Sequence, residues 1–454
     1  MNVSLPALAQ GSAAKASPVL SSEIVCRILR EVKDESEENI GWYLQNFLDL
    51  FACSLVCTVW HKAARSLLVP DEAFQQILWM GVDGGFNSIV RVAELLSESR
   101  RLGLHYCDLL TELRIPVDEL TNEESETDCD ELMEAYKTIL SIAQNVRMLN
   151  IQFEHYHPYL YSSEDMEQLY GFFDAIAPLC STITGFRLCI HDGDSDDNVP
   201  FIPYFVKAIA SYIEFLELDW QNLEDQMQEA LSLCNNLREV RIRSTPSRLL
   251  ISLIPCWPRL ERFYRRFQPP EPEYTGRLVI ELADSCPHLE EFVFESDFCV
   301  VNDLTCQAVC HLLKQNHGIK HIAVGNDSFD NTFMHQLIQN QPNLEILNLA
   351  SCTKIHFGTS FSWPQGSPWW PKLRRLLLGM CFNLEPAFIK EVVGKCPKLE
   401  VVTLPTSLQD SRDFEGFMTR LGFKYSNGEN VFGDFSMSQI TFAWRRTVAV
   451  DAAS

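Results

Sequence analysis

A Pro-x-Leu tract recurs along this chain of 454 residues and constrains its fold more than any other feature. It stands at 257–260, 286–289, 341–344, 370–373 and 396–399, and each copy continues with the spacing Leu-x-x-Leu-x-Leu or a close variant. With weaker copies included, eleven units begin at Leu110, Val146, Ile183, Ile213, Leu237, Leu260, Leu289, Ile319, Leu344, Leu373 and Leu399. Their mean spacing is about 29 residues, a period typical of repeat proteins whose units stack side by side.

The repeated spacing predicts one short strand and one helix in each unit. Alternate residues of the Leu-x-Leu piece point inward and fill a core shared with the neighbouring units, while the segment after it forms a helix on the outer side. Proline just before each strand ends the preceding helix, because proline cannot continue the helical hydrogen bonding. We therefore expect an α/β solenoid over 110–407.

A cysteine follows the spacing in the two clearest units, at Cys352 and Cys381, and Cys-Pro pairs precede two other strands. This pattern resembles the cysteine-containing class of leucine-rich repeats. The resemblance implies a horseshoe of about eleven repeats with small, buried thiols. Residues 118–134 form an acidic insert that we expect to loop out between the first two repeats. Within 408–454 an apolar set is expected to cap the last repeat: Phe414, Phe417, Leu421, Phe423, Ile440, Phe442 and Trp444.

The segment ahead of the repeats divides into three parts. Residues 1–17 are small and polar, and we expect them to be disordered. Within 18–70, apolar residues at helical spacing predict helices over 20–29 and 47–60. A helical linker over 71–109 is expected to lead to the first repeat.

Two tracts of this segment, LSSEIVCRIL at 20–29 and SLVCTVW at 54–60, resemble the F-box. That family is a three-helix module that docks on a Skp-type adaptor and, through it, on a cullin and a RING subunit. The resemblance implies adaptor contacts by apolar residues of the helices: Leu20, Ile24, Ile28, Leu29, Leu55, Val56 and Trp60. The alternative is an ordinary three-helix cap on the solenoid. An apolar helix pair ahead of a complete repeat array favours docking.

Composition excludes several classes of partner. The net charge of −24 argues against binding nucleic acid or an anionic membrane, since both require an excess of Lys and Arg. No stretch approaches the roughly 18 to 20 apolar residues that span a bilayer. The 16 cysteines form no dense framework, and the first residues show no targeting pattern. We expect a cytoplasmic or nuclear chain with reduced thiols.

An acidic run at 191–198 places carboxylates at alternate positions, as a calcium loop does. A calcium loop beginning at Asp192 requires glycine and glutamate at the positions that Asp197 and Pro203 occupy. The run is therefore interpreted as a solvated loop.

Four residues superficially suggest a zinc site: Cys306, Cys310, His317 and His321. Their spacing matches no familiar zinc finger, and they straddle the helix and strand of one repeat, so ordinary repeat packing is the better interpretation. We find no phosphate-binding glycine loop, no nucleophile motif and no acid–base pair that spacing singles out. The sequence thus indicates no catalytic residue, no metal and no cofactor.

These observations favour a non-catalytic function. The two resemblances together imply the substrate-recognition subunit of an SCF-type ubiquitin ligase, which holds a target protein near the conjugating enzyme in ubiquitin-dependent protein catabolism. A second interpretation is a leucine-rich-repeat scaffold that binds partners without a cullin. A third is an enzyme formed by the insertions. The first two differ in whether the N-terminal helices present an uncovered apolar surface.

The repeat rule also predicts which side chains could contact a target. The third, fifth and seventh places of each repeat face the concave surface, which exposes Glu239 together with the five residues Arg241, Arg243, Arg262, Tyr264 and Arg266. Residues 238–277 contain nine Arg and no Lys, against four Glu, in an otherwise acidic chain. We predict that these five residues bind an acidic or phosphorylated segment of the target, because arginine suits two-pronged recognition of anions. The alternative is a surface neutralised by its own salt bridges.

Arg265 stands where the repeat spacing expects an apolar residue. This position indicates either a local change of register or an arginine displayed for use.

Overall fold

The structure is a computed structural model. It describes residues 87–121, 129–153, 162–190, 199–220, 225–266, 272–295, 303–325, 329–349, 352–355, 369–379, 383–405, 412–426 and 443–446, with the further positions 25, 29, 51–55, 60, 62–64, 381 and 408. The chain divides into two compact units: residues 1–111 with 124–145 form unit 1, and residues 112–123 with 146–454 form unit 2. Within these described residues, no helix is both long and apolar enough to cross a bilayer.

Besides helical positions between residues 25 and 64, unit 1 contains three described helices, two before the first repeat and one within it. These are α5 (Asn87–Arg101), the 3-10 helix η2 (Tyr106–Leu109) and α6 (Cys129–Ile142). The Phe51 ring meets the Tyr106 ring edge to face, with ring centroids 4.8 Å apart, and both side chains are buried. The described positions of the predicted F-box segment therefore share a core with the end of the predicted linker.

Unit 2 contains a single 13-stranded sheet, in the order β1 to β11, then β13 and β12. The first eleven strands pair in parallel, and β13 is antiparallel to both β11 and β12. The strands are β1 (Glu112–Pro116), β2 (Met148–Phe153), β3 (Gly185–Ile190), β4 (Phe215–Asp219), β5 (Glu239–Ile242), β6 (Arg262–Arg266), β7 (Glu291–Glu295), β8 (His321–Gly325), β9 (Ile346–Asn348), β10 (Arg375–Leu377), β11 (Val401–Thr403), β12 (Phe423–Ser426) and β13 (Ala443–Arg446).

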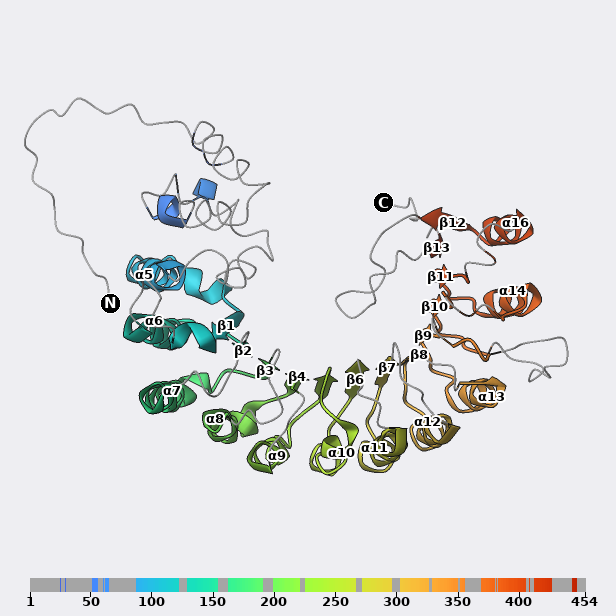
Figure 1. The fold of residues 1–454 in the computed structure, drawn as a ribbon. Helices are drawn as coiled ribbons and strands as arrows, with labels where there is room; N and C mark the ends of the chain where they lie inside the picture. Colours follow the sequence, from blue (N-terminus) through green and yellow to red (C-terminus); the bar gives the residue numbers. More distant parts are fainter. Residues whose placement is uncertain are drawn as a thin grey trace, which may run out of the picture. The chain divides into compact units, whose positions relative to one another are not determined.

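Helices connect successive strands on one side of this sheet, and in unit 2 they lie on its outer side (Figure 1). They are α7 (Ser163–Ile176), α8 (Phe201–Ile209), α9 (Asp225–Ser232), α10 (Ser247–Leu250), α11 (Pro272–Ser285), α12 (Asp303–Gln315), α13 (Asn331–Asn340), α14 (Pro386–Lys395) and α16 (Arg412–Arg420), with the 3-10 helices η3 (Val117–Leu120), η5 (Ala177–Cys180), η6 (Ala210–Tyr212) and η7 (Ile254–Cys256). The other face of the sheet is concave, and we call it the concave face.

The parallel sheet with helices confirms the expected α/β class. Each of the eleven parallel strands begins two residues after one of the eleven starts of the repeat spacing, as β4 does after Ile213. Residues at the fourth and sixth places, such as Leu216 and Leu218, are fully buried and fill the space between sheet and helices. Aromatic residues of neighbouring units widen this core, as where the rings of Phe173 and Phe201 stack with centroids 5.1 Å apart.

At three of the five Pro-x-Leu tracts, the residue before the proline donates a side-chain hydrogen bond to a carbonyl of the preceding repeat. The Trp257 indole donates to the carbonyl of Leu231 at 3.1 Å, and the Cys286 thiol donates to the carbonyl of Trp257 at 3.7 Å. Gln341 likewise donates to the carbonyl of Leu313 at 2.8 Å. Because the last carbonyls of a helix lack partners within the helix, these bonds stabilise each helix end and fix the stacking of the repeats.

The acidic insert and the C-terminal cap can be compared with what the sequence predicted. The acidic insert over 118–134 does not loop out as a whole: η3 covers its beginning and α6 begins at Cys129, so among the described residues it is mostly helical. Acidic residues in the first turn of each helix favour this structure through the helix dipole.

After the last repeat, Phe414, Phe423 and Trp444 are buried beside the antiparallel strands; Ile440 and Phe442 lie outside the described residues.

Candidate protein-binding face

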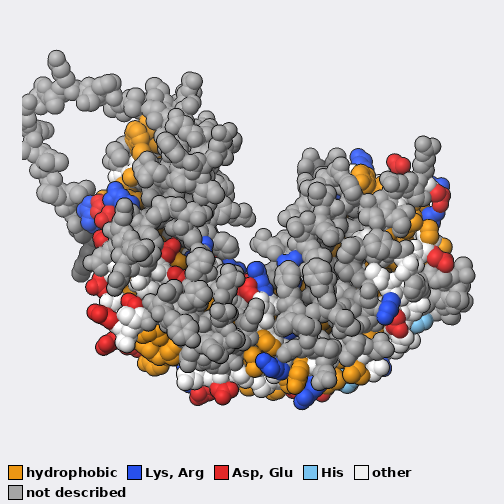
Figure 2. All heavy atoms as spheres, viewed as in Figure 1, with side chains coloured by type: hydrophobic (Ala, Val, Ile, Leu, Met, Phe, Trp, Pro, Cys, Tyr) orange, Lys and Arg blue, Asp and Glu red, His pale blue; other side chains and the backbone are white. Residues whose placement is uncertain are grey.

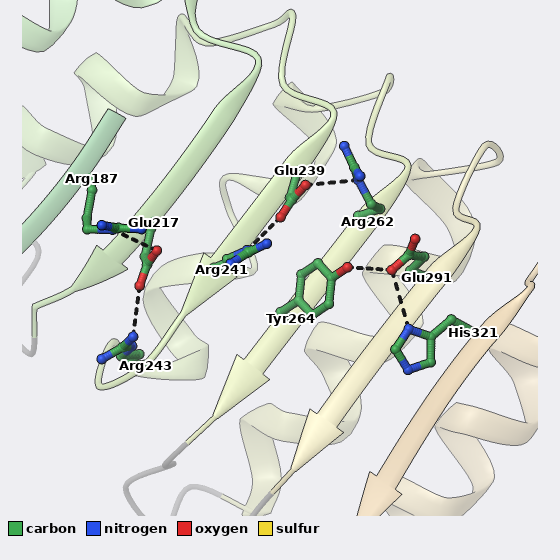
Figure 3. Close-up of polar contacts among 9 residues, drawn as sticks. All are labelled: Arg187, Glu217, Glu239, Arg241, Arg243, Arg262, Tyr264, Glu291 and His321. Carbon is green, nitrogen blue, oxygen red and sulfur yellow. Dashed lines mark hydrogen bonds and ion pairs between the residues drawn. The ribbon is translucent and has the colours of Figure 1, made fainter. Parts of the chain in front are cut away.

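The concave face of β3 to β8 carries a row of three carboxylates, each between two donor side chains, which we call the carboxylate row (Figure 3). Two of them are buried and the third is partly exposed. The first is Glu217 on β4, whose side chain is 2% exposed. Its Oε2 accepts a hydrogen bond from Arg187 Nε at 2.9 Å, and its Oε1 lies 3.1 Å from Arg243 Nη2. Arg187 also reaches Glu112 on β1, with 3.2 Å between Nη1 and Oε1. Glu217 thus joins Arg187 of β3 to Arg243, the residue after β5, and Arg187 extends these contacts to β1.

The second buried carboxylate is Glu239 on β5, with a side chain 7% exposed. It lies 2.5 Å from Arg241 Nε and 2.9 Å from Arg262 Nε, measured to its two oxygens. This finding corrects the expectation that Glu239 is an exposed contact residue. Its strand position does face the concave surface, but the two arginine side chains cover it.

Glu291 on β7 is the third. It accepts a short hydrogen bond from the Tyr264 hydroxyl, and His321 Nδ1 lies 3.3 Å from the same oxygen. The hydrogen bonds from His321 and Tyr264 hold the pKa of Glu291 below its usual value, against the opposing effect of burial. Burial and the Glu291 carboxylate raise the pKa of Tyr264, so the hydroxyl stays protonated and donates.

Arg241 lies deepest among the predicted arginines of the concave face. Its guanidinium carbon is 5.1 Å from the ring centroid of Phe215 and 5.1 Å from that of Tyr264. With the Glu239 contact, this arrangement fixes the side chain, which is 24% exposed. Arg241 and Tyr264 are therefore built into the floor of the face.

Arg243 and Arg262 protrude further. Their side chains are 39% and 43% exposed, although each contacts a buried glutamate. Arg266 on β6 lies opposite Glu295 of β7 in the strand register and is half-buried. The five predicted target-binding residues thus share one face, and the structure separates them into fixed and exposed members.

Charges of both signs balance on this part of the face. The face positions of β3 to β7 hold five arginines, Arg187, Arg241, Arg243, Arg262 and Arg266, and five carboxylates, Glu217, Asp219, Glu239, Glu291 and Glu295. The excess of arginine in the sequence is therefore offset by acidic residues of neighbouring strands.

Arg265 is not displayed. Its side chain occupies the sixth place of its repeat inside the core, is 1% exposed, and donates from Nη2 to the carbonyl of Thr245 at 3.1 Å. The register of β6 with its neighbours is regular, so the arginine replaces a core residue without shifting the strand.

The described residues of the opposite, helical side include no buried carboxylate. Figure 2 shows both signs of charge together with hydrophobic side chains along the outer side of the described elements. The exposed apolar residues there are scattered over several helices, as with Tyr204 on α8, Ile280 on α11 and Leu304 on α12. Scattered apolar residues of this kind are ordinary on a protein surface.

The structure describes three of the seven predicted adaptor-binding residues. Leu55 and Trp60 are partly exposed, in a turn and a helix, whereas Leu29 is helical and fully buried. Leu29 therefore belongs to the core of unit 1 and offers no surface to a partner. The remaining predictions, Leu20, Ile24, Ile28 and Val56, lie outside the described residues.

The rejected metal motifs can be placed in part. Cys306 and Cys310 are buried on α12, whereas His321 faces Glu291 on the concave side. In the described part of the chain, no three His, Cys, Asp or Glu side chains gather where they could hold a metal ion. The run at 191–198 lies outside the described residues.

Comparisons with known proteins add little to this geometry. No family model and no curated protein matches the chain. The similar solved structures include a complex of Rad7 and Elc1 in yeast (12% identity, 85% of this chain and 93% of that chain, TM-score 0.42) and the leucine-rich-repeat protein LIC12759 of Leptospira interrogans (12%, 67% and 80%, 0.29). A complex of TLR13 with ssRNA13 is similar at 15% identity over 66% of this chain and 36% of that chain, with a TM-score of 0.33. Similarities this low carry no argument about function.

Proposed function

We propose that this chain is a non-catalytic recognition subunit: its concave face holds a target protein and its N-terminal helices dock a Skp-type adaptor of an SCF-type ubiquitin ligase. The observation that carries the proposal is the carboxylate row of the concave face, in which Glu217 and Glu239 are buried and Glu291 is partly exposed. Three glutamates hold neighbouring side chains in place on this face of the sheet: Glu217, Glu239 and Glu291. Fixed and partly exposed side chains on a broad face suit protein recognition, because little conformational entropy is lost on binding.

The adaptor half of the proposal rests on the F-box resemblance and on the partial exposure of Leu55 and Trp60. In that arrangement, the receptor brings about no bond chemistry of its own. It raises the effective concentration of a target lysine near a conjugating enzyme.

The test is co-purification of the full chain with a Skp-type adaptor. Ile24→Ala/Trp60→Ala should abolish adaptor capture and leave unit 2 folded. Leu304→Ala is the matched control, since Leu304 is an apolar residue exposed on α12 of unit 2. Adaptor capture that persists in Ile24→Ala/Trp60→Ala would reject the F-box assignment.

A chain that binds a target but captures no adaptor would fit the second function, a repeat scaffold acting without a cullin. The concave face supports this function equally, since the three glutamates of the carboxylate row and the partners named for them all lie in unit 2.

A further inference from the structure

Of the arginines that pair with the carboxylate row, Arg243 and Arg262 have the most exposed side chains. Arg243 is held from behind by Glu217, and Arg262 by Glu239. Each glutamate is nearly inaccessible, so it fixes one edge of the guanidinium while the rest of the side chain remains partly exposed. An arginine held in this way is oriented before a ligand arrives, which lowers the entropic cost of binding an anion.

The strand register fixes the separation of these two groups. Arg262 pairs with Glu239, and Arg243 lies four residues further along the same strand as Glu239. Arg243 continues the sheet, because its backbone N–H donates to the carbonyl of Leu218 at 2.9 Å. At about 3.3 Å per residue and about 5 Å between strands, the two Cα atoms are roughly 14 Å apart. In Figure 3, Glu239 and Arg241 lie between the two side chains.

The surface between the two arginines is flat and partly aromatic. Arg241 lies there with its guanidinium between the rings of Phe215 and Tyr264. Planar groups of this kind offer a stacking surface for an apolar or aromatic side chain.

We infer that the concave face takes an extended acidic segment of the target, with carboxylates at positions i and i+4 and an apolar or aromatic side chain at i+2. Four residues of an extended chain span about 13 Å, which matches the separation of Arg243 and Arg262. In such a chain, residues i, i+2 and i+4 all point to one side. The outer two would meet the two arginines and the middle one the Arg241–Tyr264 floor. This inference rests on the proposed function of the concave face.

Carboxylates are favoured over phosphate as the anions because a buried glutamate lies directly behind each arginine. The five arginines and five carboxylates of this part of the face balance, so the face offers hydrogen bonds to a monoanion but little net attraction for a dianion.

The test uses a displayed library of random nine-residue peptides, selected on the full chain. We expect sequences with acidic residues four apart to be enriched, and a labelled peptide of that pattern to bind roughly tenfold more weakly to Arg243→Gln/Arg262→Gln. Both glutamates keep a second arginine partner in that variant, Arg187 or Arg241, so the fold should be retained. Arg243→Lys/Arg262→Lys, which keeps the charges, should weaken binding less.

The matched control is Arg238→Gln/Arg259→Gln, which removes two exposed arginines of the same segment that lie off the concave face. It should leave peptide affinity unchanged. Enrichment of peptides without the four-residue acidic spacing, equal loss in the control, or stronger binding only after phosphoserine replaces the acidic residues would each overturn the inference. Failure to enrich any peptide would also reject it, while the proposed function would still be decided separately by capture of adaptor and target.

Discussion

The Tyr264 hydroxyl on β6 donates a hydrogen bond to the Glu291 carboxylate on β7, across two neighbouring repeats. The backbone already pairs these two strands, so the Tyr264–Glu291 bond is an additional contact between them. It belongs to a set of side-chain bonds that cross strand boundaries on the concave face, and these bonds make the face a fixed surface. Three expectations about stability follow from these side-chain bonds, and a fourth concerns the leucines of the repeat core.

Tyr264→Phe removes the hydroxyl and leaves the ring in place. We expect unfolding in urea to show a loss of about 1 to 2 kcal/mol, because a hydrogen bond to a charged group is lost. Tyr204→Phe is the control, since Tyr204 donates to Asp174 on an exposed helix surface and its loss should cost below about 0.5 kcal/mol. Equal effects of the two substitutions would contradict the account.

Stability should depend on pH through Glu291. Its pKa is below the usual 4.5 because His321 and Tyr264 hydrogen-bond to the carboxylate and Arg262 lies nearby. A lowered pKa in the folded state contributes stability that is present above the unfolded pKa and is lost as the pH falls through the folded pKa. The free-energy difference between wild type and Glu291→Gln should therefore be steady above about pH 5.5 and shrink below about pH 4.5. A difference that does not change with pH would be inconsistent with this role.

Glu217→Ala removes the partner of both Arg187 and Arg243. We expect a loss of about 2 to 3 kcal/mol in the free energy of unfolding, since the carboxylate is buried, Arg243 loses its ion pair and Arg187 loses one carboxylate partner. Glu229→Ala breaks an exposed pair with Lys207 and serves as the control, with an expected cost below about 1 kcal/mol. A cost for Glu217→Ala no larger than this would show that the buried carboxylate does not organise the face.

Truncating a leucine of the repeat core should lower the free energy of unfolding. Leu347 on β9 and Leu376 on β10 are almost completely buried, and each truncation to alanine should destabilise by about 2 to 5 kcal/mol. Leu233→Ala, at an exposed position after α9, should change stability by less than about 0.5 kcal/mol. Unchanged unfolding midpoints for both buried positions would remove them from the repeat interior.

Much of the fold could be predicted because leucine spacing and backbone geometry impose the same period. The start at Ile213, for example, has no Pro-x-Leu tract, yet its apolar residues at the fourth and sixth places are buried. The helical content of the acidic insert was missed, because acidic composition alone does not distinguish the exposed face of a packed helix such as α6 from a loop.

The candidate site was predicted only in part. The alternation rule placed Arg241, Arg243 and Arg262 on the correct face, but it treats each strand by itself. The same rule, applied to β4, β5 and β7, places the glutamates on this face as well. Only the register of neighbouring strands shows which side chain meets which glutamate. Glu217, Glu291 and His321 were therefore missed, although each occupies a third or fifth place of its repeat.

The central claim is that the concave face of unit 2 selects the target, and quantitative target capture tests it most directly. Full-length wild type, Arg243→Glu/Arg262→Glu and the control Arg238→Glu/Arg259→Glu would each be used to capture proteins from a lysate, with the bound Skp-type adaptor measured in parallel. The account predicts that the concave variant loses a defined target set by about tenfold or more, while the control and all adaptor levels stay at wild type. Recovery of the same targets at equal levels by all three proteins would contradict it.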